Sequence, residues 1–362
     1  MKISGIQIFW LIFTLEAGNT LLLTVSDTIK IAKQDAWISY LIASALGVML
    51  VFVSSRVGLL YPRQTLIEFS KTILGKWLGN LVVLFYLFQW YSAVGVILSE
   101  FSDFTITILL YTTPMWVLNL SMILLIIYVL YVGGIEGIGR CAEVFGPIVF
   151  MMLLLLTLLS IPNMDIQKIL PIFYDSGFFP IVKGTVMPYS FIGESVIMLM
   201  LISFMEQPEK GPKSAVWGVA ISSIMISFAV FIVITVFGPS VAAKLRYPAF
   251  DTISYISVMN FIQNLEILAV VIWILSVFIK LSVYFFLACY GTAKWLNIKD
   301  WRKTILFVVI FTYVVSLIYP VDTLFGVKYT NKIWNPYIIP VNLIGIPILL
   351  WLVGSIRKRR SN

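Results

Sequence analysis

The sequence predicts an all-α polytopic membrane protein of about ten transmembrane helices. Hydrophobic residues make up 60% of its 362 residues and charged residues only 12%, whereas globular proteins carry about 25% charged residues. The apolar residues come as runs close to the roughly 20 residues with which a helix crosses a bilayer. These runs are apolar all round and lack the alternation of a transmembrane β-barrel.

Ten such segments follow one another along the chain. In the first, Glu16 interrupts the apolar run and no small-residue cleavage site follows, which favours an uncleaved span over a secretory signal. The predicted spans are 6–25, 37–57, 80–101, 116–132, 144–161, 184–204, 215–237, 266–288, 304–319 and 337–356.

Lys and Arg residues set the expected orientation. With the N-terminus inside, the inner connections hold about twice as many of these residues as the outer ones, and the tail at 357–360 reads RKRR. This bias predicts that both termini are cytoplasmic, and the basic tail is expected to meet anionic membrane lipid.

One inner connection has a pattern of its own. Residues 62–79 place Leu66, Phe69, Ile73 and Trp77 at helical spacing, with lysines on the opposite side. This pattern predicts an amphipathic helix on the membrane surface.

Several function classes are disfavoured by residues that the sequence lacks. The chain has no histidine and only two cysteines, and it carries no P-loop, dinucleotide fingerprint or nucleophile elbow. The net charge of +8 is spread over short tracts between spans, which does not resemble a nucleic-acid-binding face. We expect no enzyme, no cofactor, no metal site and no nucleic-acid partner.

Ionisable groups inside predicted spans are the best candidates for function, because each is costly in hydrocarbon. Glu16 lies in the middle of span 1, Glu194 in the middle of span 6, and Lys280 near the middle of span 8. Glu100 lies toward the outer end of span 3. Three carboxylates against one ammonium predict that some are protonated, or that they line a wet cavity that receives a cation, a proton or an amine.

Spans 1 and 6 share a second feature. Residues 16–20 and 188–195 are each rich in Gly, Pro or hydroxyl residues at mid-membrane depth. Paired interruptions in the first members of two five-helix halves indicate a five-plus-five inverted repeat with broken helices 1 and 6 and a site between them. The expected division is 1–161 for the first repeat, 162–356 for the second, and 357–362 for the basic tail.

Two interpretations of these segments remain open. The breaks could expose backbone groups that hold a ligand's carboxylate and ammonium, or the glycines could only permit close helix packing. On the first interpretation, Tyr91 and Tyr189 also approach the cavity. The candidate ligand-binding residues are then Gly18, Asn19, Thr20, Tyr91, Tyr189, Phe191, Ile192, Gly193 and Glu194.

Lys280 also has two interpretations. It could act as a fixed cation between spans 1 and 8, bonded to carbonyl groups near Glu16, which predicts sodium independence. Alternatively, it forms a buried pair with Glu16 or Glu194 that holds helices together.

Five stretches carry a likeness to known sequences: TLIEFSKTILGKWLGNLVVLFYLF at 65–88, EVFGPIVF at 143–150, ILPIFYDSGFFPIVKG at 169–184, SFIGESVIMLMLISFMEQPEK at 190–210, and RYPAFDTISYISVMNFIQNLEILAVVIWILSVFIKLSVYFF at 246–286. With these stretches in this order, the chain resembles the spore germination receptor B-subunit family, within the amino acid, polyamine and organocation transporter superfamily. Span 1 departs from many relatives, because it lacks their Gly-x-Gly and following Pro and has Glu16 nearby.

The resemblance implies a LeuT-like fold, residence in the inner membrane of a spore, and assembly with germinant receptor A and C subunits. It also implies that a small germinant, such as an amino acid, binds in a mid-membrane pocket lined by spans 1, 3, 6 and 8. The alternative function is a proton-coupled, sodium-independent amino acid permease, in which Glu194 or Glu16 carries the proton.

Overall fold

A computed structural model describes residues 1–174, 177–256, 265–318 and 329–361. The described chain is nearly all helical, and its one isolated β-bridge joins Ile3 to Met205. Parts of two stretches that carry the family resemblance, 175–176 and 257–264, lie outside the described residues.

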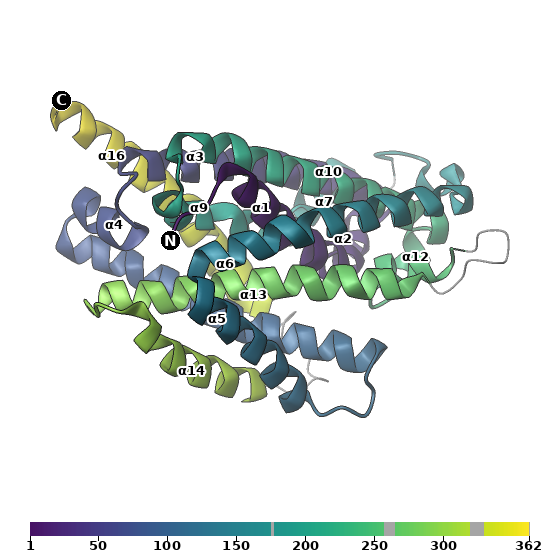
Figure 1. The fold of residues 1–362 in the computed structure, drawn as a ribbon. Coiled ribbons are helices and arrows are strands. Elements are labelled where there is room, and N and C mark those ends of the chain that lie inside the picture. The colour runs from purple at the N-terminus through teal and green to yellow at the C-terminus, as the bar shows by residue number, and fades with distance from the viewer. Residues whose placement is uncertain (175–176, 257–264, 319–328, 362) are drawn as a thin grey trace.

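Long helices form a bundle with both chain ends at the same end of the molecule (Figure 1). Its main elements are α1 (Gly5–Leu23), α2 (Val25–Ala32), α3 (Ala36–Leu60), α4 (Leu66–Leu74), α5 (Lys76–Ile108), α6 (Met115–Ser160), α7 (Phe178–Gly184), α8 (Val186–Ile192), η4 (Gly193–Ile197), α9 (Met198–Leu201), α10 (Gly211–Phe237), α11 (Pro239–Ala242), α12 (Pro248–Ser254), α13 (Glu266–Trp295), α14 (Ile305–Ile318), η9 (Thr330–Gly345) and α16 (Ile346–Ser361). Short 3₁₀ turns complete the connections: η1 (Lys33–Asp35), η2 (Ile161–Asn163), η3 (Ile166–Ile169), η5 (Ile202–Phe204), η6 (Pro208–Lys210) and η7 (Trp301–Thr304).

All ten predicted spans fall on these helices. Within the described ranges, eight helical runs are long and apolar enough to cross a bilayer. One of them, Met115–Asn163, contains two predicted spans, and it bends at Gly134, whose φ of 55° is not helical. The predicted span 304–319 corresponds to α14, whose continuation from residue 319 lies outside the described residues. The division into repeats at residue 161 stays a prediction.

The first span is interrupted later than predicted. α1 is continuous through 16–20 and ends at Leu23, and α2 begins at Val25. Thr24, between them, donates its hydroxyl to the Thr20 carbonyl at 2.6 Å and contacts the Tyr40 hydroxyl. Gly18 lies inside α1. A Cβ at this position would lie 2.6 Å from the Ser276 Cβ of α13, so only glycine lets the two helices pack this closely. In span 1 the glycine therefore serves helix packing.

The amphipathic connection also differs from the prediction. Leu66, Phe69 and Ile73 share one face of α4, but that face is buried inside the protein, and the helix stops before Gly75, where φ is 85°. Trp77 therefore belongs to α5 and is 91% exposed. The change of direction requires a positive φ, which glycine adopts at little cost.

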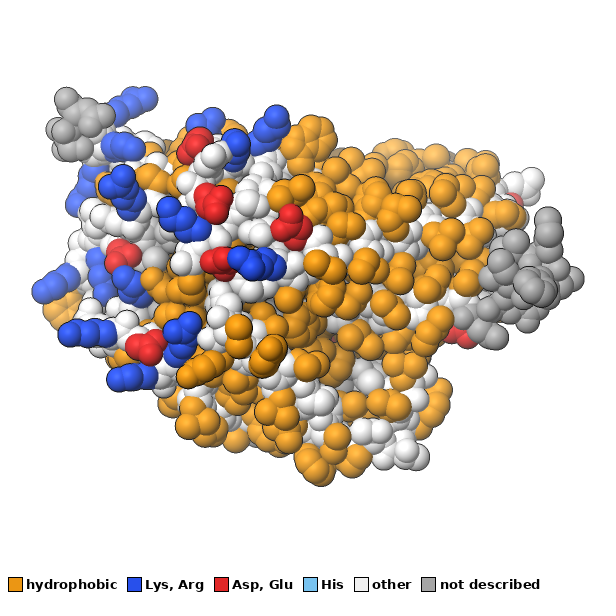
Figure 2. Space-filling view, in the orientation of Figure 1, with side chains coloured by type: hydrophobic (Ala, Val, Ile, Leu, Met, Phe, Trp, Pro, Cys, Tyr) orange, Lys and Arg blue, Asp and Glu red, His pale blue; other side chains and the backbone are white. Residues whose placement is uncertain are grey.

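On the face shown in Figure 2, charged side chains gather at the end of the bundle that holds both termini, and hydrophobic side chains cover the middle. Such a surface is expected where lipid tails contact the protein. Together with the eight apolar helical runs, it makes this an integral membrane protein.

Candidate ligand-binding site

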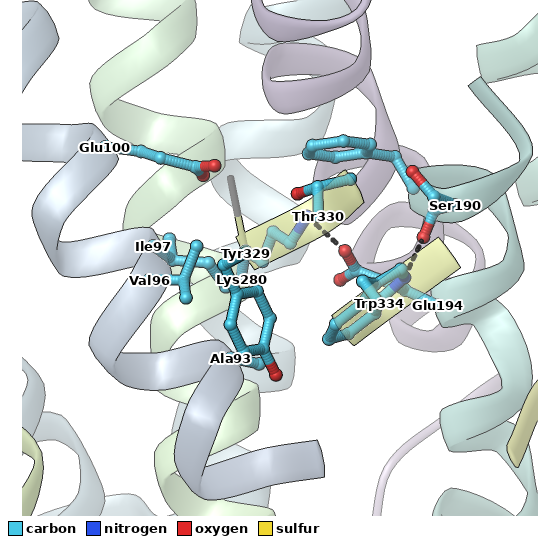
Figure 3. A pocket seen from close by; sticks show the side chains of 11 residues that line it. Ala93, Val96, Ile97, Glu100, Ser190, Glu194, Lys280, Tyr329, Thr330 and Trp334 are labelled. Carbon is cyan, nitrogen blue, oxygen red and sulfur yellow. Dashed lines mark hydrogen bonds and ion pairs between the residues drawn. The ribbon is translucent and has the colours of Figure 1, made fainter. Parts of the chain in front are cut away.

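A small cavity lies between α5, the α8–η4 segment, α13 and the start of η9. Figure 3 shows Glu100 on one wall and Glu194 on the opposite wall. The cavity is lined by Ala93, Val96, Ile97, Glu100, Ser190, Phe191, Glu194, Lys280, Tyr329, Thr330 and Trp334.

The sixth span changes its winding next to this cavity. α8 ends at Ile192 and is followed by the 3₁₀ turn η4, which begins at Gly193. Because 3₁₀ winding is tighter and less stable than α-helix, it is used in short pieces. The interruption expected in span 6 is thus present as a change of winding, and it brings Phe191 and Glu194 to the cavity wall.

Glu194 is held by two side chains of α13. Lys280 donates from Nζ to Oε1 at 2.8 Å, and the Tyr284 hydroxyl donates to Oε2 at 2.7 Å. The Lys280 ammonium also lies over the Phe191 ring, 4.8 Å from its centroid. The side chains of the ion pair are only 1% and 6% exposed, so each depends on the other for charge compensation.

Lys280 therefore takes the second of its two predicted roles. Its ammonium pairs with Glu194 of η4, and no hydrogen bond to carbonyl groups near Glu16 is present among the described residues. This pair joins span 8 to span 6 at the level of the cavity.

Glu100 projects from α5 into the cavity (Figure 3). Within the described part of the chain, its carboxyl makes no hydrogen bond and no ion pair. The sequence places it toward the outer end of span 3, and the structure shows its side chain on the cavity wall. It is a second acidic group, across the cavity from a pair that is already satisfied.

Glu16 lies away from the cavity lining. It is 1% exposed, and its Oε2 accepts a hydrogen bond from the Ser222 hydroxyl of α10 at 2.7 Å. The other carboxyl oxygen, Oε1, has no partner among the described residues.

Other predicted ligand-binding residues face elsewhere. Tyr91 points into a separate groove between α5, α13 and α14, where its hydroxyl hydrogen-bonds with Thr292 at 2.8 Å. Ile192 packs on Gly47 of α3, and a Cβ at Gly193 would meet Leu343 of η9 at 2.7 Å. The remaining four, Gly18, Asn19, Thr20 and Tyr189, do not line the cavity.

These differences have one physical cause. A transmembrane helix that is apolar all round carries little information about which face turns inward. Depth in the membrane can be read from the sequence, whereas rotation about the helix axis is set by packing.

η9 provides a wall of the cavity that the sequence did not predict. Trp334 donates from Nε1 to the Ser190 carbonyl at 3.0 Å, and Thr330 lies beside it in the cavity. The last span was predicted to begin at residue 337, whereas η9 begins at Thr330. A usable signal was Asn342, a polar residue inside the span, which bonds to Phe85 and Gln89 of α5.

An outer ion pair links α5 to the segment that precedes α12. Asp103, one turn beyond Glu100 on α5, pairs with Arg246 and accepts a hydrogen bond from the Tyr247 hydroxyl at 3.0 Å. Burial, and next the charge of Asp103, raise the pKa of Tyr247, so its hydroxyl stays protonated and donates. Tyr247 also packs edge-on against Phe104.

The cavity chemistry suits a small cationic or zwitterionic molecule. An unpaired carboxyl and the aromatic rings of Phe191 and Trp334 attract an ammonium group. Lys280 uses one of its three donors on Glu194, which leaves donors for an anionic group. Within the described ranges, no three His, Cys, Asp or Glu side chains form a group that could hold a metal ion.

Comparison with known proteins identifies the family. A family model described as "Spore germination protein" matches residues 2–323. The chain belongs to the spore germination protein family. Relatives in Bacillus subtilis (strain 168) include spore germination protein YndE, 26% identical over 77% of this chain and 76% of its own length. Spore germination protein KB is 26% identical over 83% and 80%, and spore germination protein A2 is 24% identical over 96% and 93%.

Solved structures establish the fold of this spore germination family member. A Na⁺-coupled sialic acid symporter, in a substrate-bound outward-open state, matches with a TM-score of 0.65 over 98% of this chain and 89% of that chain, at 11% identity. MhsT, in complex with L-phenylalanine, matches with the same TM-score and coverage at 13% identity. The predicted LeuT-like fold is confirmed.

Proposed function

We propose that this protein is the membrane-embedded B subunit of a nutrient germinant receptor, and that it binds a small germinant such as an amino acid in the central cavity. The observation that carries the proposal is the unpaired Glu100 carboxyl, which faces the Glu194–Lys280 pair across that cavity. Family membership supports the role in germination.

The proposed binding mode follows from charge. The ligand's ammonium lies against Glu100 and the face of an aromatic ring, and its carboxylate accepts from the free donors of Lys280. As it stands, the cavity is far smaller than the roughly 300–1,000 Å³ of ligand pockets, so an amino acid would fit only after the surrounding elements move apart. The role is binding without catalysis.

Binding would act through a shift between conformations. The cavity lies between four elements, so a ligand that fits one arrangement better stabilises that arrangement. In a receptor, the shift passes to the A and C subunits as a coupling free energy. We place the protein in the inner membrane of the spore with both termini cytoplasmic, in accord with the basic end of the bundle.

Germination of spores tests the proposal. Spores carrying Glu100→Gln should need more amino acid to germinate, whereas Glu209→Gln, a change at an exposed carboxylate, should leave the response unchanged. Immunoblots of spore membranes check that both variants accumulate. A normal response of Glu100→Gln spores would contradict the site.

A second candidate is a proton-coupled, sodium-independent amino acid permease. The likeness to MhsT, which was solved with L-phenylalanine, and the unpaired carboxyls of Glu100 and Glu16 favour it. Uptake of labelled amino acids into proteoliposomes separates the two. Robust uptake, combined with normal germination of spores that lack the gene, would overturn the receptor proposal.

A further inference from the structure

The groove that holds Tyr91 is a second concave site, beside the central cavity. It has a volume of about 840 Å³ and lies between α5, the end of α13, α14 and the start of η9. This volume falls within the roughly 300–1,000 Å³ that is usual for ligand pockets. Ten of the fifteen residues that line the groove are apolar, so it suits a ligand that is mostly hydrocarbon.

The groove opens toward the bilayer. Phe88 of α5 and Phe307 and Phe311 of α14 line it, and each of these residues is 48–60% exposed. An exposed ring on a helix in the membrane faces lipid tails or another membrane helix, since no water is present at that depth. The occupant of the groove is therefore to be sought among the components of the membrane.

The groove lies in the half of the bundle nearer both termini. α13 ends at Trp295 and α14 begins at Ile305 toward that end (Figure 1). The groove is lined there by Trp295 and Leu296 and by Phe307 in the first turn of α14. Lys and Arg side chains gather at the same end (Figure 2), and such clusters attract anionic lipid headgroups.

Side chains of the wall hold one another in place. The Tyr91 hydroxyl shares a hydrogen bond with Thr292 at 2.8 Å, and the Tyr91 ring packs edge-on against Phe311, with 5.5 Å between the ring centroids. The Tyr329 hydroxyl donates to the Ser92 hydroxyl at 2.6 Å. The four hydroxyl groups in the lining are thus paired within the protein, and a ligand need not supply partners for them.

Lys332 differs from these polar groups. It is the one charged side chain in the described lining, it is exposed, and it makes no hydrogen bond or ion pair with any described residue. An ammonium group that borders hydrocarbon needs a counter-charge. The groove therefore combines an apolar wall with a single uncompensated positive charge.

We propose that the groove binds one anionic phospholipid from the leaflet nearest both termini. Its acyl chains lie along the wall formed by Phe88, Phe307 and Phe311, and its phosphate pairs with Lys332. Contact with hydrocarbon alone does not select a lipid, because the tails of the surrounding bilayer are as apolar as the groove. Selection comes from the concave shape, which contacts a chain on several sides, and from the charge of Lys332.

A lipid in the groove would also support the central cavity. Val96 and Tyr329 line both the groove and the cavity, so they form the partition between the two. The bond from Tyr329 to Ser92 holds this partition, and the lipid covers it from the membrane side. The inference does not rest on the proposed germinant-binding role, and its test needs no amino acid.

Native mass spectrometry of the purified full chain in detergent tests the site. The protein is titrated separately with dioleoyl-phosphatidylglycerol, which is anionic, and with dioleoyl-phosphatidylcholine, which has the same chains and no net charge. We expect one phosphatidylglycerol per chain to bind about fivefold more tightly than phosphatidylcholine, the preference that one lysine confers near an anionic lipid. The comparison uses the unmodified protein, so it does not depend on a variant folding. Equal and unsaturable binding of the two lipids would overturn the proposal.

A pair of lysine variants tests the charge. Lys332→Gln should weaken phosphatidylglycerol about fivefold and remove its advantage over phosphatidylcholine. Lys299→Gln removes an exposed lysine that follows α13 and lies outside the groove lining, and it should change neither affinity. An advantage that survives Lys332→Gln would place the lipid elsewhere and overturn the site.

A pair of leucine variants tests the shape. Leu84→Trp fills the groove from α5 and should weaken both lipids about tenfold. Leu81→Trp, on the same helix, changes a leucine that is 49% exposed, against 45% for Leu84, but lies outside the lining, and it should bind like the parent. Lipid binding that is unchanged in Leu84→Trp would contradict the site. Dimers without bound lipid that disappear in Leu84→Trp would show that a second copy of the chain covers the groove, and would also overturn the proposal.

Discussion

The Lys280 ammonium lies 2.8 Å from Glu194 Oε1, and this buried pair joins α13 to the 3₁₀ turn of the sixth span. One side of the central cavity is therefore held by a fixed ion pair, while Glu100 faces it from α5 without a partner.

Breaking this pair should be costly. Lys280→Ala leaves Glu194 as an uncompensated buried charge and should lower the free energy of unfolding by about 3–5 kcal/mol. The double variant Lys280→Met with Glu194→Gln removes both charges and should recover part of that loss. Thermal melts in detergent measure both. A Lys280→Ala protein as stable as the parent would refute the pairing.

The second bond to Glu194 can be tested separately. Tyr284→Phe removes the hydroxyl that donates to Oε2 and should cost about 1.5–3 kcal/mol, the range for a hydrogen bond to a charged group. Tyr86→Phe is a matched control, because the Tyr86 hydroxyl donates to a neutral carbonyl, that of Asn342. We expect the control to lose less stability, and the reverse order would count against an ionised Glu194.

Close packing of α1 on α13 predicts the effect of a single methyl group. Gly18→Ala places a Cβ 2.6 Å from the Ser276 Cβ and should destabilise by about 1–3 kcal/mol. Gly133→Ala on α6 meets nothing within 4 Å and should be neutral or stabilising by up to about 1 kcal/mol. Equal melting temperatures for the two variants would show that the helices separate more easily than the structure indicates.

The contact between α4 and α13 should depend on pH. Burial raises the pKa of Glu68, but hydrogen bonds from the Thr65 amide at 2.9 Å and from Lys294 at 3.0 Å outweigh it and hold the pKa below its ordinary value. A lowered folded pKa means stability that is present above the unfolded pKa, about 4.3, and is lost as the pH falls through the folded value.

The stability difference between the parent and Glu68→Gln should therefore be full near pH 7 and shrink below about pH 4. Melting temperatures across this range provide the measurement. A difference that stays constant down to pH 3 would exclude the ionised carboxylate as its source.

The outer ion pair should limit access to the cavity. A thiol introduced by Val96→Cys lies on the cavity wall, and Arg246→Ala removes the partner of Asp103. We expect a membrane-impermeant thiol reagent to label this cysteine several-fold faster in the Arg246→Ala background. Lys244→Ala removes an exposed cation from the same stretch and is the control. Unchanged labelling would mean that Arg246 does not cover the cavity.

The sequence was sufficient to predict where the spans lie along the chain, but not how each helix is rotated about its axis. Runs of about 20 apolar residues locate helical segments by length alone, and the described part of each of the ten predicted spans is helical or nearly so. Glu194 and Lys280 could be chosen because an ionisable group in hydrocarbon needs a partner, and the structure pairs them. Tyr91 could not be placed, because α5 is apolar on every side and only its neighbours determine which face meets the cavity.

The local backbone conformation was the second feature that the sequence could not predict. A glycine within a span can either break the helix or allow close packing, and the local sequence does not distinguish the two. Gly18 and Gly193 both lie against a side chain of a neighbouring helix. The start of η9 lies before the predicted span 337–356, yet it contributes Thr330 and Trp334 to the cavity. Such choices depend on contacts between distant segments, which local propensity does not contain.

Equilibrium binding of labelled amino acids to the purified protein tests the central claim most directly. If Glu100 receives the ligand's ammonium, Glu100→Gln should weaken the tightest-binding amino acid of a panel at least about tenfold, or about 1.4 kcal/mol, while Glu209→Gln binds it like the parent. Equal affinities for the parent and Glu100→Gln would contradict the account.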